Sequence, residues 1–347
     1  MAHNARKEDY QRLGLRFAHA LDDGDPLDAA REFSSFGRRF AQDRDSLPQS
    51  DADRAFHLVA VAADIVDYQL PFATDEKAAE LIARGRQVLD EAVALDPNCF
   101  DAVRMKSSTE APSIGARYDF LAEKVDEVRD VCERQRDESV AACPGERTSL
   151  AADLAMRPYW RWLASMAEGA LICGRNRQCI ELCERLLESD PQDSCDARFT
   201  LALALAKLED DSGLDALIKR YPTLRPNRPA NDAWIYLARI ALAHKRHNLV
   251  EAREHVQNLM RNYPNAGITL IRQCEIPDGE FSRLNVAPYS EDELIIATSE
   301  AIVLLQEGND RSGKGVLGSW LAATAARMDP RGAAQAEAIE RQERTGR

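Results

Sequence analysis

Residues 160–191 read WRWLASMAEGALICGRNRQCIELCERLLESDP. Apolar and small residues recur at intervals of three and four on both sides of Gly174, the pattern of two helices that pack against each other. Gly174 falls where the chain must reverse in a tight turn, because glycine adopts backbone conformations that other residues avoid. The segment ends at Asp190-Pro191, and a proline cannot continue a helix. Residues 160–191 therefore predict one antiparallel helix pair.

The same pattern returns twice downstream. In residues 233–264 the packing positions fall on Trp234, Leu237, Ala238, Ala241, Ala252, Val256, Leu259 and Met260. The turn there is about two residues longer than in the usual unit of about 34 residues. Between these copies, residues 197–205 predict a first helix, and residues 214–221, which end at Pro222, predict a shortened second helix. Three adjacent pairs suffice to bury a continuous core. The sequence thus predicts an all-α fold, a tetratricopeptide-like right-handed superhelix of stacked antiparallel helix pairs.

Helical spacing extends over most of the remaining chain. The upstream stripes comprise Leu13, Phe17, Ala20 and Leu21, then Leu27, Ala30, Phe33, Phe36 and Phe40, then Phe56, Val59, Ala63 and Val66, and then Leu81, Val88, Leu89, Ala92 and Val93. We expect residues 1–145 to form an N-terminal helical region, either a cap or degenerate repeats. Residues 146–275 should hold the tetratricopeptide-like pairs, and residues 276–347 an irregular loop and C-terminal helices. Within these parts, residues 275–289 form the longest stretch without helical spacing and are the candidate functional loop.

Composition and charge exclude several classes of protein. Hydrophobic residues at 45% and charged residues at 30% are typical of a folded globular chain. The formal net charge of -13 disfavours nucleic acid, because a phosphate backbone is bound by Lys and Arg. Residues 1–10 lack the apolar segment of a secretory signal, and no run approaches the roughly 20 apolar residues of a membrane span. Without such a signal the eight cysteines are expected to be reduced. We therefore expect a cytoplasmic protein that binds neither nucleic acid nor membrane.

The segment from Gly308 to Gly315, GNDRSGKG, resembles a phosphate-binding loop through Lys314. A glycine at position 315 replaces the Ser or Thr that would bind magnesium, and the segment follows a helix rather than a buried strand. We interpret it as a turn between helices, so that no cofactor is predicted.

Four cysteines lie close together in the sequence, at positions 173, 179, 183 and 195. Only Cys179 and Cys183 have a spacing found in zinc sites, and both fall on the packed face of a predicted helix. Free cysteine on such a face behaves as a small hydrophobic residue. We predict core packing and no metal. No nucleophile elbow or zinc-protease motif is present, so no catalytic residue is predicted.

One known family resembles this chain. The resemblance rests on Leu95–Ala102, Asp190-Pro191, Arg198-Phe199, Arg220-Tyr221-Pro222, Ala233–Tyr236, Pro264, Leu270-Ile271, Tyr289 and the acidic residues 291–293. Their order is similar to that in bacterial relatives of the suppressor-of-tumorigenicity-seven proteins, a tetratricopeptide-containing group, over roughly residues 80 to 310. The resemblance implies a tetratricopeptide fold. It implies no catalytic residues.

Stacked helix pairs form a curved array whose concave wall is lined by the first helices. The inward positions of the usual unit fall on Arg161, Glu168, Phe199, Ile235 and Arg239. These residues would form a groove for a protein or peptide partner, or would contact other helices of the same chain. Our leading hypothesis is a non-enzymatic interaction scaffold. The alternatives are an enzyme or small-molecule-binding regulator with a pocket under the 275–289 loop, and a self-assembling structural protein.

Overall fold

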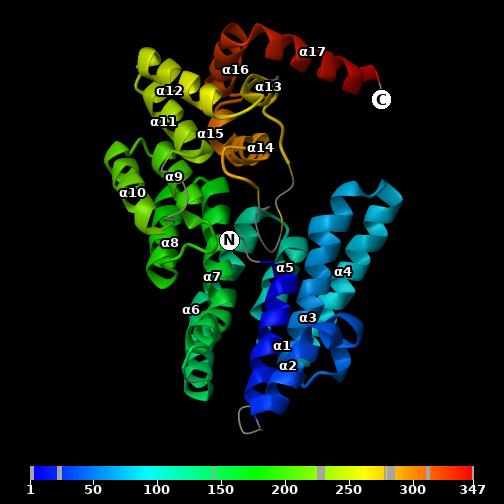
Figure 1. Ribbon diagram of the computed structural model, residues 1–347. Helices are drawn as coiled ribbons and strands as arrows, with labels where there is room; N and C mark the ends of the chain where they lie inside the picture. The colour runs from blue at the N-terminus through cyan, green and yellow to red at the C-terminus, as the bar shows by residue number, and fades with distance from the viewer. Residues whose placement is uncertain are drawn as a thin grey trace. The chain divides into compact units, whose positions relative to one another are not determined.

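The computed structural model describes residues 4–21, 26–143, 145–224, 231–276, 279, 286–309 and 313–345. Over these ranges all regular structure is helical, so the predicted all-α class is confirmed (Figure 1). The chain divides into two compact units, residues 4–169 and residues 170–276 with 286–345. No helix in the described ranges combines the length and the apolar character needed to cross a membrane. The predicted boundary at residue 145 falls just before helix α7, whereas the two units meet within that helix.

The first unit is built from seven α-helices and three short helical turns over the residues described. They are α1 (Ala5–Leu21), α2 (Pro26–Gln42), η1 (Arg44–Ser46), α3 (Asp51–Ala63), η2 (Asp64–Gln69), η3 (Leu70–Phe72), α4 (Asp75–Leu95), α5 (Phe100–Glu110), α6 (Ile114–Ala142) and α7 (Thr148–Ile172), of which the last residues belong to the second unit. Helix α3 packs against α1, α4 and α5. The four upstream apolar stripes lie in α1 to α4, except for Val66, which lies in η2. Helix α4 ends at Leu95, two residues before Pro97, which cannot continue a helix.

The start of α3 is set by a reciprocal cap. The Ser50 hydroxyl accepts the Asp53 N–H at 3.3 Å, and the Asp53 carboxylate accepts the Ser50 N–H at 2.8 Å. At its other end α3 does not stop. It continues as a π-helical segment, η2, and then as a 3₁₀ turn, η3, that contains Pro71. Isolated π-helical turns are rare and frequently occur at functional sites.

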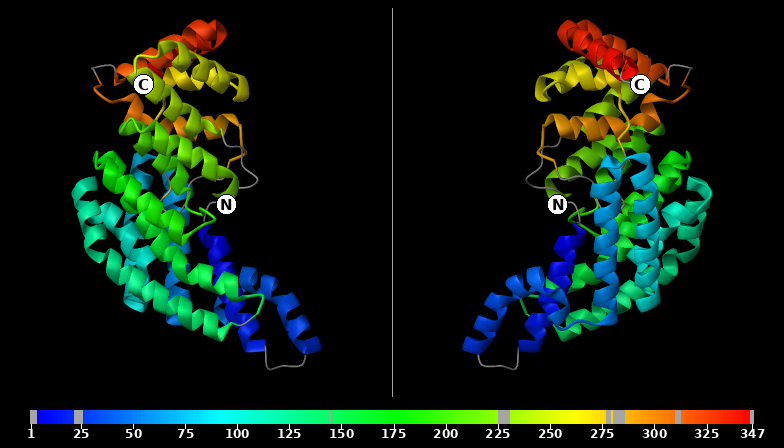
Figure 2. Two further views of the ribbon diagram at one scale, coloured as in Figure 1. Left: turned by 90° about the vertical axis from the view of Figure 1, so that its left-hand side faces the viewer. Right: turned by 90° about the vertical axis from the view of Figure 1, so that its right-hand side faces the viewer.

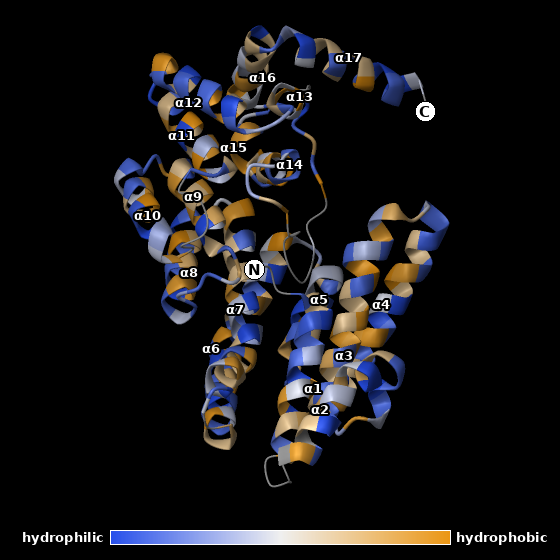
Figure 3. Ribbon diagram, viewed as in Figure 1, coloured by the Kyte–Doolittle hydropathy of each residue, from blue (hydrophilic) through white to orange (hydrophobic). Residues whose placement is uncertain are grey.

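The second unit contains ten helices in the part of the chain that is described. They are α8 (Asn176–Ser189), α9 (Ala197–Lys207), α10 (Asp211–Leu224), α11 (Ala233–Lys245), α12 (Leu249–Asn262), α13 (Ala266–Arg272), α14 (Glu291–Glu300), α15 (Ile302–Leu305), α16 (Val316–Met328) and α17 (Pro330–Thr345). Residues 197–206 of α9 are all buried. Helices α10 and α12 carry both hydrophobic and hydrophilic residues (Figure 3). Helices α16 and α17 pack beside α13 (Figures 1 and 2).

Three turns in this unit repeat the same backbone pattern. Gly174, Glu209 and His247 each adopt a left-handed conformation, with φ of 72°, 59° and 61°. In each case the next residue donates its N–H five residues back: Arg175 to Ala170 at 2.8 Å, Asp210 to Leu205 at 3.0 Å and Asn248 to Ala243 at 2.9 Å. This is the Schellman motif, which satisfies carbonyls at a helix end. The three turns give the unit a helical-repeat-like character.

Two local predictions about these pairs are wrong. The second helix of the middle pair is not shortened, because α10 spans Asp211–Leu224 and is 14 residues long, like α8 and α12. It begins early because the Asp210 carboxylate accepts the Gly213 N–H at 2.9 Å, and it continues past Pro222 to Leu224. The turn between α11 and α12 is also not extended, since residues 246–248 match residues 173–175 and 208–210 in length.

The left-handed turns allow a paired stability test. Glu209→Gly should raise the free energy of unfolding of the second unit by about 0.5–1 kcal/mol, because glycine has no Cβ to strain at positive φ. Gly174→Ala should lower it by a similar amount, since an added Cβ would meet no atom within 4 Å and only the backbone strain would count. Urea denaturation of both variants measures the two changes. Changes of the same sign would contradict this assignment of the strain.

Candidate functional site

Helix α1 buries two carboxylates in the first unit. Glu8 and Asp9 are 1% and 2% exposed, and the helix also buries Leu13 and Phe17 on the same inward side. Acidic side chains are almost never fully buried unless they are paired. The partners of the two carboxylates therefore show whether these groups are free to act as acids or bases or are held in structural ion pairs.

Glu8 is enclosed by three guanidinium groups. Arg12 donates to Oε1 at 2.8 Å, and Arg161 and Arg157 donate to Oε2 at 2.9 Å and 3.3 Å. Arg161 also binds Asp101 of α5 in a bidentate pair, with Nε 2.7 Å from Oδ1. Burial alone would raise the pKa of Glu8, but Arg161, Arg12 and Arg157 together hold that pKa far below its ordinary value. Glu8 is therefore a permanently ionised anchor.

Asp9 has a second set of partners. Arg44 of η1 donates to both oxygens, at 2.9 Å and 2.6 Å, and His57 Nδ1 of α3 lies 2.8 Å from Oδ2. Burial would raise the pKa of Asp9, but the hydrogen bonds from His57 and Arg44 lower it. Both buried carboxylates are thus ionised and occupied by cations. This arrangement holds α1 in place and leaves neither group positioned as a general base.

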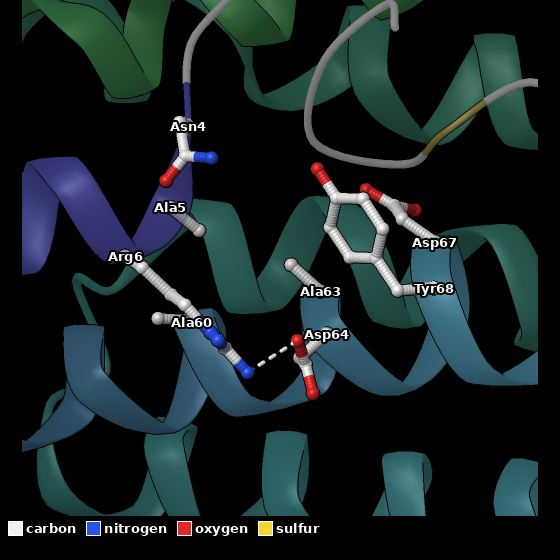
Figure 4. A pocket seen from close by; sticks show the side chains of 8 residues that line it. All are labelled: Asn4, Ala5, Arg6, Ala60, Ala63, Asp64, Asp67 and Tyr68. Carbon is white, nitrogen blue, oxygen red and sulfur yellow. Dashed lines mark hydrogen bonds and ion pairs between the residues drawn. The ribbon is translucent and has the colours of Figure 1, made fainter.

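A small open depression lies beside the N-terminal end of α1 (Figure 4). It is lined by Asn4, Ala5, Arg6, Ala60, Ala63, Asp64, Asp67 and Tyr68. Arg6 Nη2 lies 2.6 Å from Asp64 Oδ1, and Gln69 donates to Asp64 Oδ2 at 3.0 Å. Figure 4 shows Tyr68 and Asp67 together on one side of the depression, and Asn4 and Arg6 of α1 on the other. The π-helical segment supplies the wall that bears Tyr68.

Two aromatic side chains stand exposed at this place. Tyr68 is 52% exposed, and Phe72, four residues later in η3, is 87% exposed. The π-helical turn that bears Tyr68 is fixed to the unit because Ile65 of the same turn is 1% exposed and lies against Gly85 of α4. The aromatic rings and the polar groups of the depression form a contact surface. We call Asn4, Arg6, Asp64, Tyr68 and Phe72 the π-segment surface.

The amino-acid sequence gives little indication of the π-segment surface. Residues 64–72, DIVDYQLPF, continue the apolar spacing of α3, so they suggest one more turn of ordinary helix. Pro71 was the available signal, because a proline marks the end of a helix and exposes the residues around it.

The five residues predicted to line a groove do not come together in one unit. Arg161 and Glu168 belong to the first unit, and the other three to the second. Arg161, Phe199 and Ile235 are 3%, 2% and 0% exposed, whereas Glu168 is exposed and Arg239 half-buried. The three buried residues contact other helices of their own unit. The sequence left this arrangement open as the alternative to a groove for a partner.

The inner helices of the repeat pairs are covered by the chain itself. The Phe199 ring stacks on Trp234 with centroids 3.6 Å apart. The indole N–H of Trp234 then donates to Glu300 of α14 at 2.8 Å. Helix α14 packs against α11, and α15 packs against α9. Side chains of α14 and α15 therefore lie where a partner was expected.

The remaining motifs have structural roles in the described residues. Lys314 donates to the Ile271 carbonyl at the end of α13. A Cβ at Gly315 would lie 2.2 Å from the Glu307 carbonyl oxygen, so packing requires glycine there. Cys179 and Cys183 are fully buried, which confirms their predicted place in the core. Residues 310–312, and residues 277, 278 and 280–285 of the predicted functional loop, lie outside the described ranges.

Comparisons of the chain with known protein families, with curated proteins and with solved structures found no match. Over the described residues, no group of three or more His, Cys, Asp or Glu side chains is arranged to hold a metal ion. A function for this chain is therefore inferred from the structure of its surfaces alone.

The buried carboxylates predict how stability depends on pH. The folded-state pKa values of Glu8 and Asp9 are lowered from 4.5 and 3.8, so the unfolded chain takes up protons first as the pH falls. The free energy of unfolding of the first unit should be constant above about pH 5 and decrease below it. Chemical denaturation at pH 7, 5, 4 and 3 measures this slope.

Glu8→Gln tests the same network at neutral pH. The change leaves Arg161 with one buried carboxylate instead of two, and breaking a buried ion pair costs about 3–5 kcal/mol. The variant should also have a shallower acid slope than the parent. Glu123→Gln, an exposed change on α6, is the matched control and should behave like the parent. An unchanged slope in Glu8→Gln would show that folding does not lower the pKa of Glu8.

Proposed function

We propose that this chain is a non-enzymatic scaffold that binds a protein or peptide partner in the cytoplasm, through the π-segment surface. The observation that carries the proposal is the exposure of Tyr68 in the wall of a polar depression, with the exposed Phe72 four residues later in the chain. Aromatic residues are enriched in protein interfaces and contribute a large share of binding energy there. The groups around the depression add hydrogen bonds that orient a bound segment.

The π-segment surface is pre-organised. Ile65 anchors the π-helical turn in the unit, and the Arg6–Asp64 pair fixes the rim at 2.6 Å. A surface that is ordered before binding loses less conformational entropy on association. Glu8 and Asp9, the two deeply buried acids that follow Arg6 in α1, are both held in ion pairs. These features support recognition rather than chemistry.

We further propose that the helix pairs of the second unit belong to a tetratricopeptide-like right-handed superhelix, and that the chain is related to the suppressor-of-tumorigenicity-seven group. The three equivalent turns at residues 174, 209 and 247 support this assignment. Since α14 and α15 cover the inner helices, the partner surface of this scaffold lies on the π-segment and not in the predicted groove.

The double substitution Tyr68→Ala/Phe72→Ala tests the proposed surface. The tagged full-length chain is used to capture partners from its native host, and captured proteins are identified by mass spectrometry. Binding of a captured partner to the variant should be at least about tenfold weaker, because two exposed aromatic contacts are lost. Circular dichroism and thermal unfolding should be unchanged, since both side chains are largely exposed.

Ile172→Ala provides the control, because Ile172 is 55% exposed and lies in the second unit. This variant should bind the partner as the parent does. Equal affinity of the parent and the Tyr68→Ala/Phe72→Ala variant for every captured protein would remove the π-segment surface from consideration.

A further inference from the structure

A separate feature of the second unit goes beyond the proposed scaffold function. Lys207 is the last residue of α9 and Lys245 is the last residue of α11, so they occupy equivalent positions in successive helix pairs. Both meet the carboxylate of Glu307, which follows α15. Lys207 Nζ lies 3.2 Å from Oε1, and Lys245 Nζ lies 3.1 Å from Oε2. One glutamate side chain thus bridges two ammonium groups.

The two lysines are held in position by backbone carbonyls. Lys207 Nζ donates to the Val303 oxygen at 3.0 Å, and Lys245 Nζ donates to the Lys207 oxygen at 3.4 Å. Their side chains are only 15% and 18% exposed. These contacts fix the direction of both ammonium groups whatever carboxylate lies between them. The lysines therefore form a prepared site.

Glu307 is the more exposed member of the cluster, at 47% of its side chain. Burial would raise the pKa of Glu307, but the hydrogen bonds from Lys245 and Lys207 lower it, so the group is ionised. Its backbone is held independently, because Gly315 packs against the Glu307 carbonyl and donates to the Leu305 oxygen at 2.9 Å. The side chain can leave the lysines without any movement of the turn. Partly exposed ion pairs are also weak enough to exchange.

We propose that Lys207 and Lys245 form a binding site for the carboxylate of an acidic peptide segment, and that Glu307 is its intramolecular competitor. The occupant in the structure is itself a glutamate side chain on a polypeptide turn, which indicates the class of ligand. Two cations face one anion, so the site keeps an excess positive charge that favours a segment with more than one acidic residue. A partner segment would displace the Glu307 side chain and take both ammonium contacts.

A direct binding experiment tests the site on the full-length chain. The probe is a fluorescently labelled tetraglutamate peptide with acetylated and amidated ends, and binding is followed by anisotropy at low ionic strength. Glu307→Gln should tighten binding by about three- to tenfold, because the site is no longer partly occupied from within. Glu337→Gln removes the same charge from the exposed helix α17 and should leave the affinity unchanged.

The lysines are tested in the Glu307→Gln background. Lys207→Met/Lys245→Met keeps the side-chain stems and removes both charges, and it should abolish the gain. Lys219→Met, an exposed change on α10, should preserve it. If Glu307→Gln fails to fold, Glu307→Asp, whose shorter side chain reaches the lysines less well, should give a smaller gain.

Three outcomes would overturn the proposal. They are an equal affinity of the parent and Glu307→Gln for the probe, a retained gain after loss of both lysines, and competition by acetate as strong as by unlabelled peptide at the same carboxylate concentration. The last result would make the site a general anion site instead of a peptide site. All three are independent of Tyr68 and Phe72, so a failure here and a failure of the π-segment surface are distinguishable.

Discussion

The guanidinium of Arg161 lies between two buried carboxylates, 2.9 Å from Glu8 of α1 and 2.7 Å from Asp101 of α5. Arg161 itself is on α7, so one side chain fixes three helices of the first unit. Arg161 is the partner that the two carboxylates share, and the desolvation of a buried charge is repaid only by close and well-oriented partners. The position of α1 follows from this contact. The position of the depression follows in turn, since Ala5 and Arg6 begin the same helix and Asn4 directly precedes it.

The second unit depends on a different constraint: each first helix must end in a tight turn that satisfies its last carbonyl groups. Each of the three equivalent turns closes with a hydrogen bond to the carbonyl five residues back, and each uses a single left-handed residue. Only one of them is glycine. Glu209 and His247 accept the strain because the hydrogen bonds of the motif, and the packing of the helices on either side, determine the backbone there.

Local signals in the sequence predicted the helices well. Gly174 marked a turn, and Asp190-Pro191 marked the end of α8 at Ser189. These features depend only on residues that are close in the sequence, so the spacing of residue types along the chain indicates them. The buried ion pairs around Arg161 could not be predicted in the same way. Arg161 and Glu8 are 153 positions apart, so no window of sequence shows that they meet. The sequence therefore left open whether Arg161 faces a partner or contacts other helices of the chain, and the structure buries it.

The π-segment surface was missed for another reason. A π-helical turn has the composition of an α-helix, and residues 64–69 differ from their surroundings only in how the backbone closes. That small change buries Ile65 and leaves Tyr68 half exposed. In the second unit α14 and α15 cover α11 and α9, so the inner helices build the core of the unit. The two surfaces that we propose for recognition are places where regular packing is interrupted: the π-helical turn after α3, and the ends of α9 and α11, where Lys207 and Lys245 meet Glu307.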